Sequence, residues 1–140
     1  MKKVMAFGTF DLLHAGHLHY LNEAKKQGDY LVVVITTDEN VKKSKGKFPV
    51  NNQEQRKELV ESLKMVDEAV VGDEKDYYKV VEKIRPAIIA LGYDQAEKKD
   101  AVQEKLRKRG FDVEVVRITP YKEGLHKSSK MKERIRKDLT

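Results

Sequence analysis

Cysteine is absent from this 140-residue chain. Its absence excludes disulfides, a catalytic thiolate and any zinc site that uses cysteine ligands. Long apolar runs are absent too: no stretch approaches the roughly 20 residues of a membrane helix, and the chain begins with a strand-like segment rather than a signal peptide. These absences predict a cytoplasmic protein with no membrane partner.

Three common catalytic motifs are also missing. No G-x-G-x-x-G follows the first expected strand, no G-x-x-x-x-G-K-[ST] phosphate loop occurs, and no serine lies in a G-x-S-x-G turn. The sequence therefore gives no support to a dinucleotide-binding enzyme, a P-loop nucleotidase or a serine hydrolase of the usual kinds.

Charged residues, in contrast, make up 37% of the chain, and Lys and Arg exceed Asp and Glu by 29 to 23, a net charge of +6. The apolar residues come in clear runs, which indicates a folded chain, and its length predicts a single domain over residues 1–140. The basic excess favours anionic partners such as nucleotides, phosphorylated metabolites or nucleic acid. A solvated surface with a few extra lysines explains the composition equally well.

Strand-like and helix-like segments alternate along the chain. We expect strands at residues 2–8, 29–36, 68–72, 87–92 and 111–118. We expect helices at residues 17–28 and 76–84, at 97–109, from an Asn51-x-x-Glu54 capping box onward, and from Ser128 onward. This order predicts an α/β fold, a Rossmann-like three-layer sandwich with a five-stranded parallel sheet. Such sheets bind ligands beyond the carboxyl ends of their strands.

The segment FGTFDLLHAGH follows the first expected strand. Gly8 and Gly16 allow the backbone to approach a ligand closely, and Thr9 offers a hydroxyl and an amide. His14 and His17 are three residues apart at the start of a helix, so they should point to the same side. A helix N-terminus attracts phosphate, and two imidazoles would complete a cradle that stabilises charge on a phosphoryl group.

Two other interpretations of the histidine pair stay open. The histidines could bind a metal, or one could be buried and the other exposed at the surface. Metal-binding histidine pairs on helices usually need a third ligand, and neither cysteine nor an H-E-x-x-H pattern accompanies this pair. We therefore predict no metal site built from protein ligands.

A lysine-rich segment, VKKSKGKF, follows the second expected strand. A charge run of this kind is usually a solvated loop, but a glycine-containing lysine loop could also form a flexible lid over a triphosphate. We expect either Lys45 or Lys47 to reach the phosphates. Arg56 is the stronger candidate because it lies on an expected helix.

Further candidates lie in the C-terminal third of the chain. Asp94 directly follows an expected buried strand, where its carboxylate could bind a ribose hydroxyl or a base amino group, or could cap the next helix. Ser128 and Ser129 could be helix N-caps or could hold phosphates.

The segment GTFDLLHAGH resembles the signature of the HxGH nucleotidyltransferase superfamily. These enzymes transfer a nucleotidyl group from a nucleoside triphosphate to a phosphate-type acceptor and release pyrophosphate. The resemblance extends over nearly the whole chain, through the segments TTDE, EQRKELVESLKMVDEAVVG, IALGYDQ and EGLHKSSKMKERI.

Within the superfamily the chain is similar to two groups, the glycerol-3-phosphate cytidylyltransferases and the archaeal FAD synthases. Cytidylyltransferases carry RTEGIST before the last helix and an arginine near the position of Lys64, whereas this chain has YKEGLHKSS. The archaeal group often has cysteines near its C-terminus, which this chain lacks. The resemblance favours transfer of AMP from ATP to FMN, with transfer of CMP from CTP to glycerol 3-phosphate as the alternative.

The resemblance also implies roles for particular residues. His14 and His17 would be catalytic, binding the α- and β-phosphates and stabilising the transition state. Lys45 or Lys47, together with Arg56, would hold the triphosphate or the acceptor phosphate. The implied nucleotide-binding residues are Gly8, Thr9, Phe10, His14, Ala15, Gly16, His17, Asp94, Tyr121, Ser128 and Ser129.

The resemblance further implies partners and a cofactor. A divalent metal such as Mg²⁺ would arrive with the nucleoside triphosphate, and the family commonly forms homodimers. The rival from another class is a non-enzymatic basic module that binds nucleic acid through its lysines. Because the basic residues are scattered over the expected helices and lack interleaved aromatic residues on a strand face, we expect no nucleic-acid partner.

Overall fold

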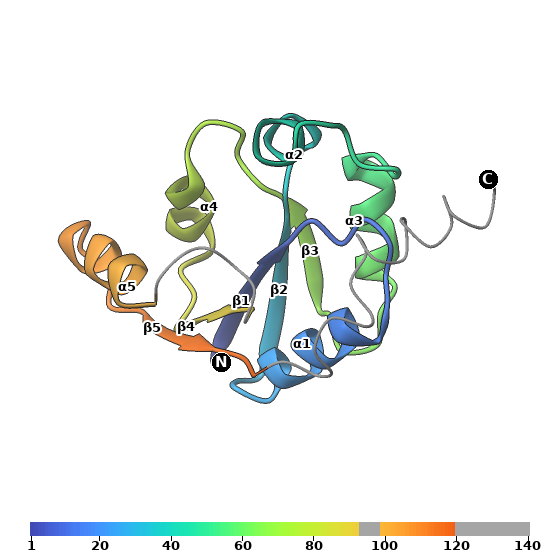
Figure 1. The fold of residues 1–140 in the computed structure, drawn as a ribbon. Helices are drawn as coiled ribbons and strands as arrows, with labels where there is room; N and C mark the ends of the chain where they lie inside the picture. The colour runs from blue at the N-terminus through green and yellow to red at the C-terminus, as the bar shows by residue number, and fades with distance from the viewer. Residues whose placement is uncertain (93–98, 120–140) are drawn as a thin grey trace, which may run out of the picture.

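The computed structural model describes residues 1–92 and 99–119. Its centre is a parallel sheet of five strands in the order β3-β2-β1-β4-β5 (Figure 1). The strands are β1 (Lys3–Gly8), β2 (Tyr30–Ile35), β3 (Glu68–Val71), β4 (Ile88–Leu91) and β5 (Glu114–Arg117). The central strands are continuous apolar runs because helices cover both of their faces.

Helices pack on both faces of this sheet. One apolar core joins the sheet to α1 (Ala15–Lys25) and α3 (Gln53–Glu61), and a second core joins the opposite face to α4 (Tyr77–Ile84) and α5 (Lys99–Lys108). Figure 1 shows the two helix pairs on opposite sides of the strands. These layers confirm the predicted three-layer α/β fold.

The strand order reverses between β1 and β4. From β1 the chain proceeds outward through β2 to β3, then returns across the sheet to place β4 against the other side of β1. In open α/β sheets a ligand crevice forms at such a reversal, outside the carboxyl ends of the strands. The loop that follows β1 therefore lies where a binding site is expected.

Helix α2 (Asp38–Lys45) was not expected from the sequence, where this region was predicted to be a lysine-rich loop. Thr37 caps its start by accepting a hydrogen bond from the Asn40 amide at 3.2 Å. Gly46 ends it in the left-handed conformation (φ 80°). A capping threonine and a terminal glycine together stabilise a short helix even when its surface is mostly lysine.

The predicted capping box of the third helix is wrong by one residue. Asn52 is the N-cap of α3, and its side chain and that of Gln55 exchange hydrogen bonds with each other's backbone amides. Asn51 instead donates its side-chain amide to the carbonyl oxygen of Asp11 at 2.9 Å, so a tertiary contact takes it out of the cap. Helix α1 also ends at Lys25, earlier than predicted.

No helix within the described ranges has both the length and the apolar character needed to cross a membrane. The predicted helix that begins at Ser128 lies outside the described residues.

Candidate active site

The loop after β1 leads into helix α1, and His14 caps this helix. The His14 backbone is extended, and its Nδ1 atom accepts a hydrogen bond from the Gly16 amide at 3.0 Å. In return, Nδ1 of His17 accepts a hydrogen bond from the His14 amide at 3.3 Å. Reciprocal bonds of this kind form a capping box. Its N-cap residue is usually serine or threonine, and the residue three positions later is usually glutamate or glutamine. Here the imidazoles of His14 and His17 accept the hydrogen bonds of these two amides.

These bonds determine which nitrogen of each imidazole carries the proton. A neutral imidazole has one donor and one acceptor nitrogen, so a ring that accepts through Nδ1 carries its hydrogen on Nε2. The rings of His14 and His17 are stacked, with centroids 3.9 Å apart and planes 22° apart. Both rings can therefore donate through Nε2 at the start of a helix, where the backbone also favours an anion.

The His17 imidazole is neutral at physiological pH. Burial is the largest cause that lowers the pKa of His17 from 6.5 to about 4, and electrostatic repulsion involving the neighbouring His14 and Lys45 lowers it further. The Nε2–H group is consequently present without a positive charge.

Phe10 packs against His17, one of the two histidines. Its side chain is buried, and its ring meets the His17 ring edge-on with centroids 5.3 Å apart. Its backbone adopts φ 52°, a left-handed conformation that is strained for a residue with a side chain. A Cβ atom at Gly8 would lie 2.6 Å from the Phe10 ring, so the strained loop also requires glycine at that position.

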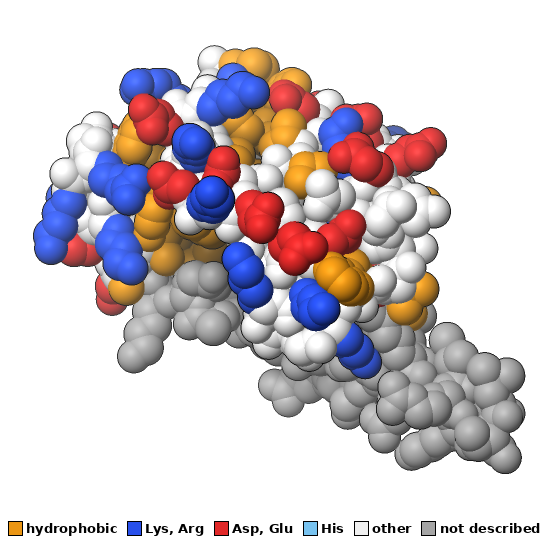
Figure 2. All heavy atoms as spheres, turned by 90° about the horizontal axis from the view of Figure 1, so that it is seen from above, with side chains coloured by type: hydrophobic (Ala, Val, Ile, Leu, Met, Phe, Trp, Pro, Cys, Tyr) orange, Lys and Arg blue, Asp and Glu red, His pale blue; other side chains and the backbone are white. Residues whose placement is uncertain are grey.

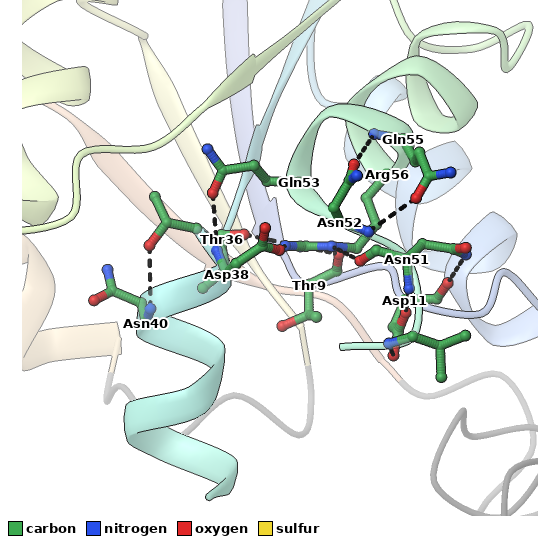
Figure 3. Close-up of polar contacts among 12 residues, drawn as sticks. Thr9, Asp11, Thr36, Asp38, Asn40, Asn51, Asn52, Gln53, Gln55 and Arg56 are labelled. Atoms are coloured by element: carbon green, nitrogen blue, oxygen red, sulfur yellow. Dashed lines mark hydrogen bonds and ion pairs between the residues drawn. The ribbon is translucent and has the colours of Figure 1, made fainter. Parts of the chain in front are cut away.

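Asp11 connects this loop to the segment before α3. Its carboxylate accepts hydrogen bonds from the backbone amides of Val50 and Asn51, at 2.8 and 2.9 Å (Figure 3). With the Asn51 side-chain bond to the Asp11 carbonyl, three bonds hold the two loops together. The Asp11 side chain is almost completely buried, and it orders the loops through these bonds.

Arg56 is positioned differently from the prediction. Its side chain is 0% exposed, and its guanidinium spans the ends of several segments (Figure 3). Its partners are the carbonyl oxygens of Asn51 at 2.9 Å, Thr9 at 2.9 Å and Thr36 at 2.8 Å, and the carboxylate of Asp38 at 2.7 Å. In this arrangement the guanidinium is enclosed by protein, so the structure gives no support to the predicted phosphate contact. Arg56 instead braces the loops that follow β1 and β2.

The two candidate lysines are both exposed, but only one of them lies in a helix. Lys45 lies in the last turn of α2, and Lys47 follows the glycine that ends this helix. The structure therefore corrects the prediction of a flexible lid for the first half of the segment, which is helical. The second half packs back on the helix, since the Lys42 ammonium lies 4.6 Å from the centroid of the Phe48 ring.

The structure brings together the N-terminal part of the predicted nucleotide site. Gly8 and Thr9 lie at the carboxyl end of β1, and Ala15 and Gly16 form the first turn of α1 between the histidines. The predicted contacts at Asp94, Tyr121, Ser128 and Ser129 lie outside the described residues.

Sequence reasoning missed Tyr20. The helical pattern identified only the apolar residues of α1 that face the core. It did not identify the Tyr20 hydroxyl, which bonds to the backbone of two strands. A tyrosine on a helix that packs against the core could have indicated this role, because a buried hydroxyl needs a hydrogen-bond partner.

Among residues 1–92 and 99–119, no group of three or more histidine or acidic side chains is arranged to hold a metal ion. The donors at this site are imidazole and backbone N–H groups, which suit phosphate oxygens better than a cation.

Comparison with known proteins agrees with this chemistry. The family described as cytidylyltransferase-like matches residues 5–134. An FAD synthase from Ferroglobus placidus is 54% identical over 136 residues, which cover 96% of this chain and 88% of that protein. An FAD synthase from Picrophilus torridus is 48% identical, with 95% of each chain covered.

Solved structures show the same fold. A protein from Thermoplasma volcanium, described as a lipopolysaccharide core biosynthesis protein, superposes with a TM-score of 0.84 at 46% identity and covers 87% of this chain and 99% of its own. A pantoate–β-alanine ligase from Francisella tularensis superposes with a TM-score of 0.66 at 17% identity, covering 94% of this chain and 65% of its own, a likeness of fold alone.

Proposed function

We infer, because this chain belongs to the cytidylyltransferase-like family, that it is a nucleotidyltransferase which moves AMP from ATP to FMN, giving FAD and pyrophosphate. The observation that carries this proposal is the 54% and 48% identity to FAD synthases over nearly the whole chain. The paired imidazole donors at the start of α1 supply a site of matching chemistry.

The proposed reaction needs no covalent intermediate on the protein. A phosphate oxygen of FMN attacks the α-phosphorus of ATP in line, a new P–O bond forms, and the bond to the bridging oxygen of the β-phosphate breaks. Pyrophosphate leaves with the electron pair of that bond. Rate enhancement then depends on positioning and on donors that stabilise charge on the phosphoryl oxygens.

His14 and His17 are proposed to be those donors. Their Nδ1 atoms are occupied by backbone amides, so the Nε2–H groups are directed by the helix itself and need no rearrangement during the reaction. The amides of Gly16, His17 and Leu18 are already bonded to His14, so we propose that the imidazoles, rather than these amides, contact the phosphates. Lys45, near His17, is proposed to add positive charge at the triphosphate.

A divalent metal is proposed to accompany the nucleotide and to shield its triphosphate charge. Because no three-ligand cluster occurs in the described part of the chain, the phosphate oxygens would supply most of its coordination.

The direct test is a pyrophosphate-release panel in which ATP or CTP is combined with FMN or glycerol 3-phosphate, with Mg²⁺ or another divalent metal. We expect release only with ATP and FMN, with FAD identified by chromatography. Release with CTP and glycerol 3-phosphate instead would establish the cytidylyltransferase alternative. Release with neither pair would refute the proposed function.

We also propose that the protein forms a homodimer, as the family resemblance implies. Sedimentation at several protein concentrations checks this, and a single species of about 16 kDa would contradict it.

A further inference from the structure

Strands β1 and β4 separate before either of them ends. Along its other edge, β1 pairs with β2 as far as Gly8, which lies opposite Ile35. Its pairing with β4 stops at Ala6, which lies opposite Ala90. The pairing with β4 thus ends two residues before β1 does, at the point where the strand order reverses.

The hydroxyl of Tyr20 lies where the two strands separate. It accepts a hydrogen bond from the Phe7 amide of β1 at 3.1 Å and donates one to the Ala90 carbonyl of β4 at 2.5 Å. A side-chain hydroxyl from helix α1 therefore bridges the two strands and satisfies backbone groups on both of them. Strands held through an inserted hydroxyl lie farther apart than strands joined by direct backbone bonds.

The Tyr20 ring packs against Phe10, which in turn contacts His17. It lies nearly parallel to the Phe10 ring, with an angle of 16° and centroids 6.4 Å apart, and Phe10 in turn meets His17 edge-on. One side chain thus connects the spacing of the two strands to the support of His17.

We propose that Tyr20 is a positioning residue that holds β1 and β4 apart at their carboxyl ends, and so sets the width of the crevice that receives the nucleoside triphosphate. This inference rests on the proposed nucleotidyl transfer. Without the hydroxyl, the Phe7 amide and the Ala90 carbonyl can bond directly, which would bring the two strands together and narrow the crevice. If they stay apart, both groups lose this hydrogen bond, and the ends of the two strands become less well ordered.

Tyr20→Phe tests the proposal because it removes only the bridging oxygen. Tyr30→Phe is the matched control: the Tyr30 hydroxyl donates to the Glu68 carboxylate at 3.2 Å, at the other end of the sheet.

ATP binding is measured by titration calorimetry without acceptor, and steady-state kinetics with FMN follow. We expect Tyr20→Phe to raise the Kd and KM for ATP about tenfold, while kcat and the KM for FMN change less than about threefold. Tyr30→Phe should leave all four values within about twofold.

Equal ATP affinity in Tyr20→Phe and the wild type would overturn the proposal, and so would an equal loss in Tyr30→Phe. If Tyr20→Phe does not fold, the wild type provides the measurement: ATP should shift the NMR signal of the Phe7 amide, and an unchanged signal overturns the proposal. The calorimetric and NMR experiments use ATP alone, so they are independent of the acceptor. ATP binding that depends on Tyr20, without FAD formation in the panel, would refute the FMN acceptor and retain the positioning role.

Discussion

At the scale of single residues, His14 and His17 each use their two ring nitrogens for different purposes. Nδ1 accepts a backbone amide and builds the helix cap, and Nε2 carries the hydrogen available to a ligand. The cap therefore fixes the tautomer on which the proposed catalysis depends. Serine, threonine or glutamate could satisfy the same amides, but an imidazole also supplies an N–H donor on the opposite side of its ring.

Two substitutions of His17 keep an acceptor for the helix cap and remove the Nε2 donor. In His17→Asn, the side-chain oxygen can replace the Nδ1 acceptor but nothing replaces Nε2, so we expect kcat to fall about a thousandfold with little change in melting temperature. His17→Gln can also keep the cap, because Gln55 accepts from the N-cap amide at the same position of α3, but its amide group then cannot stand at the place of Nε2. We expect a similar fall in kcat with little loss of stability. Pyrophosphate-release kinetics and thermal unfolding measure both effects. A folded His17→Asn enzyme of wild-type activity would contradict the catalytic assignment.

The lowered pKa of His17 predicts how stability depends on pH. The unfolded chain binds a proton at His17 near pH 6.5, whereas the folded chain does so only near pH 4. Between these values the unfolded state binds more protons, so the His17 contribution makes the unfolding free energy fall as the pH drops from 6.5 to 4, with no further change below. Urea unfolding at several pH values should show a steeper decline in the wild type than in His17→Asn. Parallel profiles would show that His17 titrates normally in the folded protein.

At the scale of elements, the loops after β1 and β2 are held by buried polar groups. Arg56 bonds to the carbonyls of Thr9 and Thr36, and Asp11 bonds to two amides before α3. These bonds join the start of α3 to the ends of two neighbouring strands. The loop that carries the histidines is consequently supported by segments that are distant in sequence.

Arg56→Lys tests whether Arg56 braces these loops or binds phosphate. Lysine keeps the charge but cannot reach the same set of partners, so we expect a loss of about 3 kcal/mol in unfolding free energy, measured with urea. Arg109→Lys is the matched control, because Arg109 is half exposed and its ion pair with Asp76 is 3.9 Å long; its cost should be below about 0.5 kcal/mol. Unchanged stability with a raised KM for ATP would restore the phosphate contact predicted from the sequence.

At the scale of the whole molecule, the excess of basic residues is not gathered into one stripe on the face that Figure 2 displays. Viewed from above, acidic and basic side chains are interspersed across this face, with apolar patches between them. A nucleic-acid backbone binds best to a continuous basic surface. The described residues on this face therefore offer no continuous basic surface to a nucleic-acid backbone.

This distribution predicts weak binding to nucleic acid. At about 150 mM salt we expect duplex DNA or RNA to bind with a Kd weaker than about 100 μM, measured by fluorescence anisotropy, while ATP still binds. Micromolar duplex affinity that falls steeply with salt and survives His17→Asn would favour the rival view of a basic binding module.

The sequence by itself determined the five strands and the place of the histidine segment after the first of them. Apolar β-branched runs separated by helical patterns predict the parallel sheet, and the histidines, glycines and helix start that form the cradle are contiguous from residue 7 to 17. Helix α2 was not predicted, although Thr37, two acidic residues and Gly46 mark its ends. The resemblance of the remaining segments indicated the acceptor, which the relatives support.

Only the tertiary structure decided what Arg56 and Tyr20 do. The partners of Arg56 lie as far as 47 positions away in sequence, and the Tyr20 hydroxyl joins strands whose residues are 13 and 70 positions away. A pattern of neighbouring residues reports local preference and which face is buried. It does not report which distant carbonyl or amide meets a buried donor, because those pairs exist only once the strands have been placed side by side.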